Sequence, residues 1–258
     1  MKYKSVILGS LVAAATVGIS HAASMLPLAA TGWENDIVFG GTDTLAFGIS
    51  GGINGSVDNG VSDGSTWYEL GYNGGAPTTG LPTAVTNSQS LGADLSFQLQ
   101  PFGTGNVKVN NAVLAGGTLS LVAPAPMVRL ALIGSTGNGD SNLSVTVNFA
   151  DLSTETFPLT GTTGIEQDWF GGTGIAYTAG GRTEGSGFGT PGDNPRLYQS
   201  VFTLVNQTSA VNSVTINAAA GGNSAIMAIS GEAVPEPTSA VLLGLGALSL
   251  IGIRRRNA

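Results

Sequence analysis

The central two hundred residues consist of short apolar segments separated by glycine, asparagine, aspartate or proline, with almost no helical periodicity. Two segments alternate strictly: residues 95–99 place three apolar side chains on one face, and residues 143–149 place four there. Such alternation is typical of strands with one buried and one solvated face. The less regular candidate strands span residues 37–39, 45–47, 67–70, 107–109, 118–122, 127–133, 154–159, 197–205, 211–216 and 225–229.

About a dozen strands without a helix predict an all-β fold, and we expect a jelly-roll-like β-sandwich. An open sheet of that size would expose its apolar face, whereas two packed sheets bury both. The densest glycine region, residues 171–192, is expected to form one long loop. Because no repeat or linker interrupts the body, a single domain is favoured; two small sandwiches divided near residues 114–118 are the alternative.

Residue types that are rare or missing exclude much chemistry. The chain has no cysteine, so disulfides, cysteine-ligated metals and thiol nucleophiles are excluded. Its one histidine, His21, would be lost with a cleaved N-terminal segment, and imidazole ligands and general bases with it. Residues 23–234 carry four basic and fifteen acidic side chains, an acidic balance that excludes nucleic acid as an expected partner.

The N-terminus has the order of a secretory signal peptide. Lys2 and Lys4 precede an apolar run over residues 6–19, and small residues follow up to Ala22 and Ala23. This order predicts that residues 1–22 are a helical signal peptide, which signal peptidase removes between Ala22 and Ala23. An uncleaved anchor or a buried helix is the alternative, but the run is short for a membrane span.

Three segments follow one another at the C-terminus: residues 234–237 with the sequence Val-Pro-Glu-Pro, the apolar residues 240–253, and the arginines at 254–256. The two prolines keep the first segment extended and accessible. Fourteen apolar residues at ~1.5 Å each reach about 21 Å, less than the ~30 Å hydrocarbon core, so a short and marginal transmembrane helix is predicted. The arginines favour a cytoplasmic C-terminus, which places the body outside.

This order resembles the PEP-CTERM sorting signal of Gram-negative bacteria that produce exopolysaccharide, over about the last 25 residues. In proteins with such a tail, the membrane-embedded cysteine protease-like transpeptidase exosortase is understood to act near the Pro-Glu-Pro. The resemblance implies transient anchoring in the inner membrane and then release or transfer to the envelope exterior. An ordinary tail anchor is the alternative. The recognition and stop-transfer residues that the resemblance implies are Pro235, Glu236 and Pro237, and Arg254, Arg255 and Arg256.

The body loosely resembles β-sandwich modules that are associated with carbohydrates in bacteria. The residues that carry this resemblance are 132–140, Asp151-Leu152-Ser153, Asp168-Trp169-Phe170 and Arg196-Leu197-Tyr198. Leu152 departs from it, because a turn of this kind usually has glycine there. Aromatic rings stack on sugar faces, so Trp169 with Asp168 beside it is the candidate ligand contact. Core packing is the alternative for each tryptophan.

No further motif assigns a catalytic or metal site. Carboxylates are numerous enough for a glycosidase, but nothing selects a pair, so we expect no enzyme and name no catalytic residue. Residues 58–64 and 137–142 are oxygen-rich, and either a Ca²⁺ site or an ordinary hairpin turn fits them. Residues 187–192 fit G-x-G-x-x-G by chance, because prolines surround them and no helix follows.

The predicted organisation is a signal peptide over residues 1–22, a β-sandwich over 23–233 and a sorting signal over 234–258. The expected function is that of an exported, exosortase-processed, non-enzymatic protein of the cell surface or of an exopolysaccharide biofilm matrix. A carbohydrate-binding module is the alternative, and a secreted hydrolase acting on glycosides is the third. The expected partners are signal peptidase, exosortase, the membrane through the C-terminal helix, and extracellular polysaccharide.

Overall fold

The structure, a computed structural model, describes residues 24–40, 46–47, 52–53, 65–71, 80–103, 109–160, 163–184, 187–188 and 193–235. The predicted signal peptide, the residues after Pro235 and the turn at 58–64 lie outside them. Every regular element within them is a strand, which confirms the all-β prediction. Since the described residues contain no helix, they offer no helical segment that would reach across a bilayer.

Nine of the strands form one antiparallel sheet, and the others pair in four two-stranded ladders. In chain order the strands are β1 (Leu26–Pro27), β2 (Ala30–Thr31), β3 (Val38–Phe39), β4 (Ala46–Phe47), β5 (Gly52–Ile53), β6 (Trp67–Tyr68), β7 (Thr86–Ser88), β8 (Gly92–Phe97), β9 (Val113–Leu114), β10 (Thr118–Ala125), β11 (Met127–Phe149), β12 (Thr154–Thr160), β13 (Ile175–Thr178), β14 (Thr183–Glu184), β15 (Gly187–Phe188), β16 (Arg196–Thr203) and β17 (Val211–Ala233). The division of the chain into segments stays a prediction.

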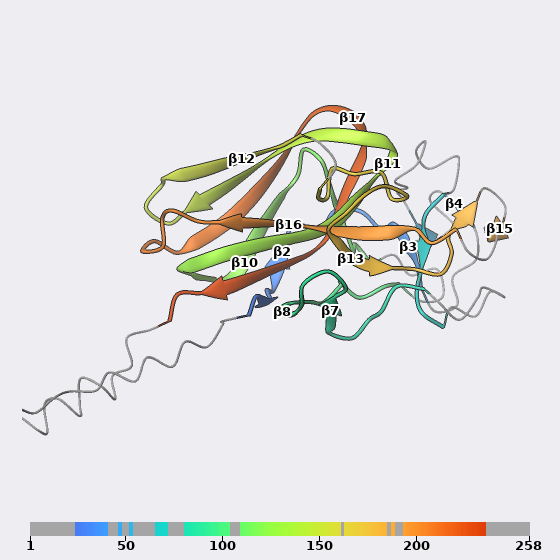
Figure 1. Ribbon diagram of the computed structural model, residues 1–258, viewed down its shortest axis with the longest axis horizontal. Helices are drawn as coiled ribbons and strands as arrows, with labels where there is room; N and C mark the ends of the chain where they lie inside the picture. Colours follow the sequence, from blue (N-terminus) through green and yellow to red (C-terminus); the bar gives the residue numbers. More distant parts are fainter. Residues whose placement is uncertain are drawn as a thin grey trace, which may run out of the picture.

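Two strands of 23 residues, β11 and β17, form the centre of the large sheet and pair antiparallel along their length. We predicted two short strands in each of these segments, and that is wrong. Between Gly137 and Ser141 the register shifts, and Asn138 and Gly139 have φ values of 63° and 89° there. These residues make a bulge instead of a chain-reversing turn, so the strands bend and continue (Figure 1).

The bend brings two halves of the large sheet face to face. One half has the order β13-β16-β11-β17, with β1 and β9 on the other side of β17. The other half has the order β12-β11-β17-β10-β2. The halves therefore pack as the two sheets of a sandwich do, while β11 and β17 carry the hydrogen bonding from one to the other. A jelly-roll strand order is not shown by the described residues.

The inner core fills the space between the two halves. Leu130 and Leu132 of the first half join Val145 and Val147 of the second half in one buried cluster. All four side chains are fully buried. The predicted alternation of residues 143–149 is confirmed, because every second side chain there is buried.

A second core lies on the outer face of the first half. Ala131 and Ile133 point away from the inner core, since successive side chains of a strand face opposite ways. They pack in one cluster with Trp67, Leu95 and Phe97, which belong to the chain before β9. The alternation predicted for residues 95–99 is therefore confirmed too. The preceding segments thus cover the sheet face that would otherwise be exposed.

The glycine-rich region that we predicted as one loop contains the strands β13, β14 and β15. β13 is an edge strand of the large sheet and pairs with β16, with Ile175 opposite Tyr198 and Thr178 opposite Arg196. The prediction of a continuous loop over residues 171–192 is wrong, because the four residues Ile-Ala-Tyr-Thr of β13 suit an edge position between glycines.

Leu152, at the tip of the hairpin between β11 and β12, lies in the left-handed backbone region. Its φ is 68° and its side chain is 91% exposed, so no burial compensates a conformation that costs a non-glycine residue roughly 1–2 kcal/mol. We expect Leu152→Gly to raise the free energy of unfolding of residues 23–235 by about 1 kcal/mol, somewhat less than the strain because glycine is freer when unfolded. Urea denaturation measures this change.

Gly139→Ala is the matched reverse substitution. Gly139 has a φ of 89° and open space where a Cβ would stand, so only backbone strain changes. It should lower the free energy of unfolding by about 1 kcal/mol. An unchanged or lower urea midpoint in Leu152→Gly would contradict the interpretation of strain at this hairpin.

Candidate functional site

The C-terminal end of β17 is paired with the start of β11 up to the point where the chain leaves the body. Ala233 pairs with Met127 of β11, and the N–H of Val234 donates to the carbonyl of Pro126 at 3.1 Å. Pro235, the first predicted recognition residue, is exposed and is the last residue described. Glu236, Pro237 and the arginines lie outside the described residues. The tripeptide therefore begins two residues after a paired strand, with no spacer.

The N-terminal end of the described chain lies beside this point. Leu26 and Pro27 of β1 pair antiparallel with Gly231 and Ser230 of β17. The chain consequently enters and leaves the body at the same end, as Figure 1 shows. We predict signal cleavage between Ala22 and Ala23. These two residues come just before the described part of the chain.

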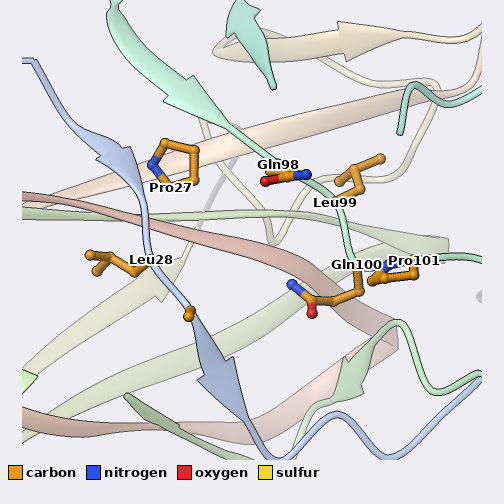
Figure 2. Close-up of a pocket in the computed structure, with 7 residues that line it drawn as sticks. Pro27, Leu28, Gln98, Leu99, Gln100 and Pro101 are labelled. Atoms are coloured by element: carbon orange, nitrogen blue, oxygen red, sulfur yellow. The ribbon is translucent and has the colours of Figure 1, made fainter. Parts of the chain in front are cut away.

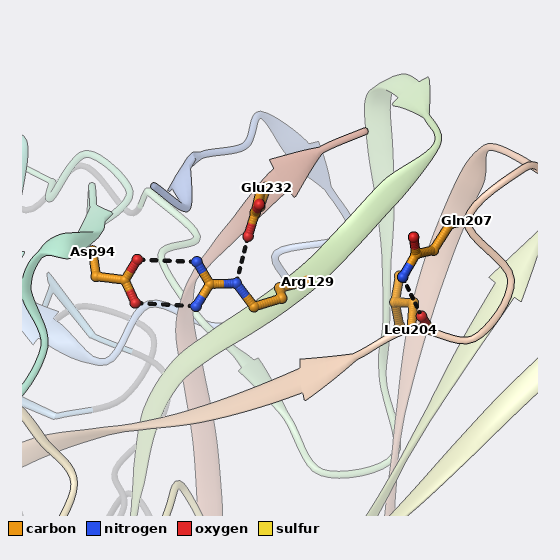
Figure 3. Close-up of polar contacts among 5 residues, drawn as sticks. All are labelled: Asp94, Arg129, Leu204, Gln207 and Glu232. Atoms are coloured by element: carbon orange, nitrogen blue, oxygen red, sulfur yellow. Dashed lines mark hydrogen bonds and ion pairs between the residues drawn. The ribbon is translucent and has the colours of Figure 1, made fainter. Parts of the chain in front are cut away.

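The side chain of Arg129 in β11 links the C-terminal end of β17 to β8 (Figure 3). The two Nη atoms of Arg129 in β11 donate to the carboxylate oxygens of Asp94 in β8, each at 3.0 Å. Its Nε donates to the carboxylate of Glu232 in β17. The planar guanidinium thus donates to one carboxylate through its two Nη atoms and to a second carboxylate through Nε. The ammonium group of lysine cannot reproduce this arrangement.

These contacts change the ionisation of the groups in a consistent direction. Hydrogen bonds from Arg129 lower the pKa of Asp94 below its ordinary value, and the same bonds with those to Glu232 raise the pKa of Arg129. Asp94 and Arg129 are therefore both charged at neutral pH. We did not predict this cluster; the one signal in the sequence was the scarcity of basic residues in the body, which makes Arg129 one of four.

Trp169, the predicted ligand contact, lies in the outer core and is 1% exposed. Its ring meets Trp67 edge-on, with centroids 5.0 Å apart and an interplanar angle of 78°. The guanidinium of Arg182 lies 5.2 Å from the Trp169 ring centroid. The faces of this indole are thus covered by protein. Phe170, whose ring is 40% exposed, is the neighbouring aromatic side chain that solvent reaches.

Asp168, the other predicted contact, fastens the bulge of β11 to the segment before Trp169. Its Oδ2 accepts from the N–H of Gly139 at 2.9 Å, and its Oδ1 accepts from the N–H of Phe170 at 3.0 Å. Asp140 in turn accepts from the N–H of Asp168 at 2.7 Å. Among the residues that the structure describes, no three acidic or imidazole side chains come together as metal ligands would.

Two carboxylates are buried. Asp36 accepts from the side-chain amide of Asn111 at 2.8 Å and from the N–H of Val109 at 3.0 Å. Glu166 is 2% exposed, and its Oε2 has no hydrogen-bond partner within the described part of the chain. Such a group is costly to bury, so Glu166 stands out among the acids that the structure describes.

Two grooves of similar size open on the described surface, and no charged side chain lines either of them. One has a volume of about 320 Å³ and lies between the segment that joins β1 to β2 and the residues after β8 (Figure 2). The other, about 340 Å³, lies between β12 and β16. Amide and hydroxyl groups are the polar side chains in their walls. The lining residues are Pro27, Leu28, Ala29, Gln98, Leu99, Gln100 and Pro101 for the first, and Phe157, Pro158, Leu159, Thr163, Gln199, Ser200, Val201 and Phe202 for the second.

Comparison with known proteins identifies one segment of the chain. Residues 233–256 match the family model of the PEP-CTERM protein-sorting motif. The match begins at the last residue of β17 and includes the tripeptide and the arginines, which confirms the resemblance inferred from the tail. The search of curated proteins finds no match for the chain. The motif indicates an exported protein that exosortase targets.

Proposed function

We propose that this chain is exported with a cleaved signal peptide, held briefly in the inner membrane of a Gram-negative cell, and then processed by exosortase. The body then acts without catalysis, at the cell surface or in an exopolysaccharide matrix. The observation that carries the proposal is the sorting motif at residues 233–256, placed directly after a strand that is paired on both sides.

The position of both chain ends supports the membrane-bound stage of this proposal. Residues 6–19 and 240–253 are two long apolar runs of the sequence. The first precedes β1 and the second follows β17, and β1 pairs with the C-terminal end of β17. A body whose two membrane-directed segments leave from one end is able to stand on one membrane surface. The arginines Arg254, Arg255 and Arg256 would stop transfer on the cytoplasmic side.

The character of the described grooves supports a role without catalysis. Glycoside hydrolysis needs two carboxyl groups at a set separation on either side of the bond to be cleaved. The walls of both described grooves hold amide and hydroxyl groups instead. The finer architecture that we propose is a jelly-roll-like sandwich, which the facing halves of the large sheet favour.

A carbohydrate-binding module is the second candidate. Phe170 favours it, because this residue is 40% exposed while the guanidinium of Arg182 lies over its ring, 5.2 Å from the centroid. Beside it, the guanidinium of Arg196 donates to the carbonyls of Phe170 and Gly171 at 3.1 and 2.6 Å, which fixes the backbone under the ring. An aromatic side chain held in this way is a common contact for a sugar face.

The C-terminal mass of the protein isolated from its native host tests the sorting proposal. We expect the wild-type chain to end near residues 235–237, and Glu236→Ala to leave the full chain in the membrane fraction with Ala258 at its end. Thr238→Ala, just beyond the tripeptide, is the matched control and should be processed as the wild type is. A mature wild-type protein that still ends at Ala258 would leave an ordinary tail anchor and refute exosortase processing.

A further inference from the structure

One end of the body, here called the exit end, gathers the chain ends and two loop tips. It consists of the hairpin tip at residues 150–153, the loop at 204–210, the turn at 124–126 and residues 234–235. Figure 1 shows these segments at the left end of the body, opposite the bend of β11 and β17. The exit end is therefore the part of the described body that is nearest to the sorting motif.

The two tips of the exit end carry the most exposed large apolar side chains of the described residues. Leu152 is 91% exposed and Val205 is 90% exposed. Leu152 also holds a left-handed backbone that glycine would adopt more easily. A leucine that is both unburied and strained is not explained by the folding of this hairpin.

Hydrogen bonds hold the two tips together as one rigid surface. The carboxylate of Glu155 accepts from the N–H groups of Val205 and Asn206, at 3.0 and 2.6 Å. The side-chain amide of Asn206 donates to Asp151 at 3.1 Å and to Ser153 at 2.9 Å. The tips are thus preorganised, and little conformational entropy is lost when they meet a partner.

The loop that carries Val205 is also hydrogen-bonded to β11, next to the C-terminal end of β17. The N–H of Leu204 donates to the carbonyl of Val128 at 2.9 Å, and Val128 follows Met127, which pairs with Ala233. The tips and the start of the sorting motif therefore belong to one hydrogen-bonded unit.

The length of chain after Pro235 sets how far this end can be from a bilayer. The apolar run begins at residue 240, and five residues span at most about 18 Å when fully extended. If residues 240–253 are embedded, as proposed above, Pro235 lies no further than this from the hydrocarbon boundary. The headgroup region takes up about 5–8 Å of that distance, so a tail that is not fully extended brings the exit end within reach of lipid.

We propose that the exit end rests on the lipid bilayer before processing, with Leu152 and Val205 inserted shallowly among the headgroups. Two apolar side chains bind a bilayer weakly on their own, but the tail supplies a high local concentration. The hydrogen bonds that Asp151 accepts from Ser153 lower the pKa of this carboxyl, so it stays charged and limits insertion to the interface. This inference rests on the proposed membrane segment of the tail.

The absence of cysteine allows a direct test with the full chain. Leu152→Cys and Val205→Cys, each labelled with a nitrobenzoxadiazole fluorophore, are reconstituted through the uncut tail into phosphatidylcholine vesicles that contain doxyl-labelled lipid. Asn223→Cys is the control, because Asn223 is exposed and pairs with Gly137 at the bend of β11 and β17, which Figure 1 shows away from the exit end. We expect roughly half of the fluorescence to be quenched at 152 and 205, with little loss at 223.

Flotation of the vesicles separates the two proposals. If the protein floats with its vesicles but shows the same small quenching at all three positions, the exit end does not rest on lipid. The proposed tail anchor would then still stand. Protein that does not float would overturn both. Because Leu152 and Val205 are both about nine-tenths exposed, their replacement does not disturb a core, and unchanged urea midpoints confirm this.

Discussion

Trp169→Ala is expected to lower the free energy of unfolding of the body by about 3–5 kcal/mol, the range for removal of a large buried aromatic side chain. The indole is 1% exposed, packs edge-on against Trp67, and supports the guanidinium of Arg182. Its removal leaves a cavity in the outer core and removes these contacts together. Urea denaturation of residues 23–235, followed by tryptophan fluorescence and circular dichroism, measures the change.

Phe170→Ala is the matched control, because the next residue along the chain has a ring that is 40% exposed. Its truncation should cost about 1 kcal/mol, since much of the ring is already in water. Equal urea midpoints for Trp169→Ala and the parent protein would contradict the core role. A loss of glycan binding in Trp169→Ala would report unfolding, so a sugar site is tested with Phe170→Ala in a folded protein.

Arg129→Met is expected to lower the free energy of unfolding by about 2–3 kcal/mol, because two carboxylates lose their charged partner at once. The expected loss of stability is smaller than for a fully buried ion pair, because the side chain of Asp94 is 39% exposed and that of Glu232 is 12% exposed. Methionine keeps the length of the aliphatic stem and removes the five donors. Urea denaturation at pH 7 measures the loss.

The same variant changes how stability depends on pH. Arg129 lowers the pKa of Asp94 in the folded state, so the contribution of this carboxylate is present above the unfolded pKa of about 3.9 and is lost as the pH falls through the folded value. The parent protein should therefore lose stability below about pH 4 more steeply than Arg129→Met does. Asp94→Asn is the control. It should lose the steep fall of stability below about pH 4, while Arg129 keeps its ion pair with Glu232. Identical acid profiles for all three proteins would contradict this account.

Local patterns were sufficient to predict the all-β class, the alternation within two strands and the sorting signal. The alternation at 95–99 and 143–149 fixes which side chains are buried, since it depends on residues two apart in one strand. The tail is likewise a contiguous run, and its order of tripeptide, apolar run and arginines is read without any tertiary contact.

Contacts between distant residues were beyond sequence reasoning. The partners of Arg129 lie 35 and 103 positions away, and nothing local distinguishes this arginine from one on a solvated face. Trp169 could be placed in the core only through Trp67, which the chain brings to it from a different segment. For residues 137–142 we predicted a hairpin turn or a Ca²⁺ site, and the bulge was missed because a bulge and a turn use the same residues.

The position of β17 in the sheet has a consequence for the order of events during export. This strand is the last to be synthesised, yet β1, β9, β10 and β11 all pair with it. A chain secreted from its N-terminus cannot complete the half with β10 and β12 until residues 211–221 have crossed the membrane, nor the half with β1 and β16 until residue 233 has crossed. Because the sorting motif starts at that residue, the body finishes folding only when its tail is already at the membrane. Exosortase would therefore meet the motif beside a sheet that has just closed, which couples sorting to the completion of folding.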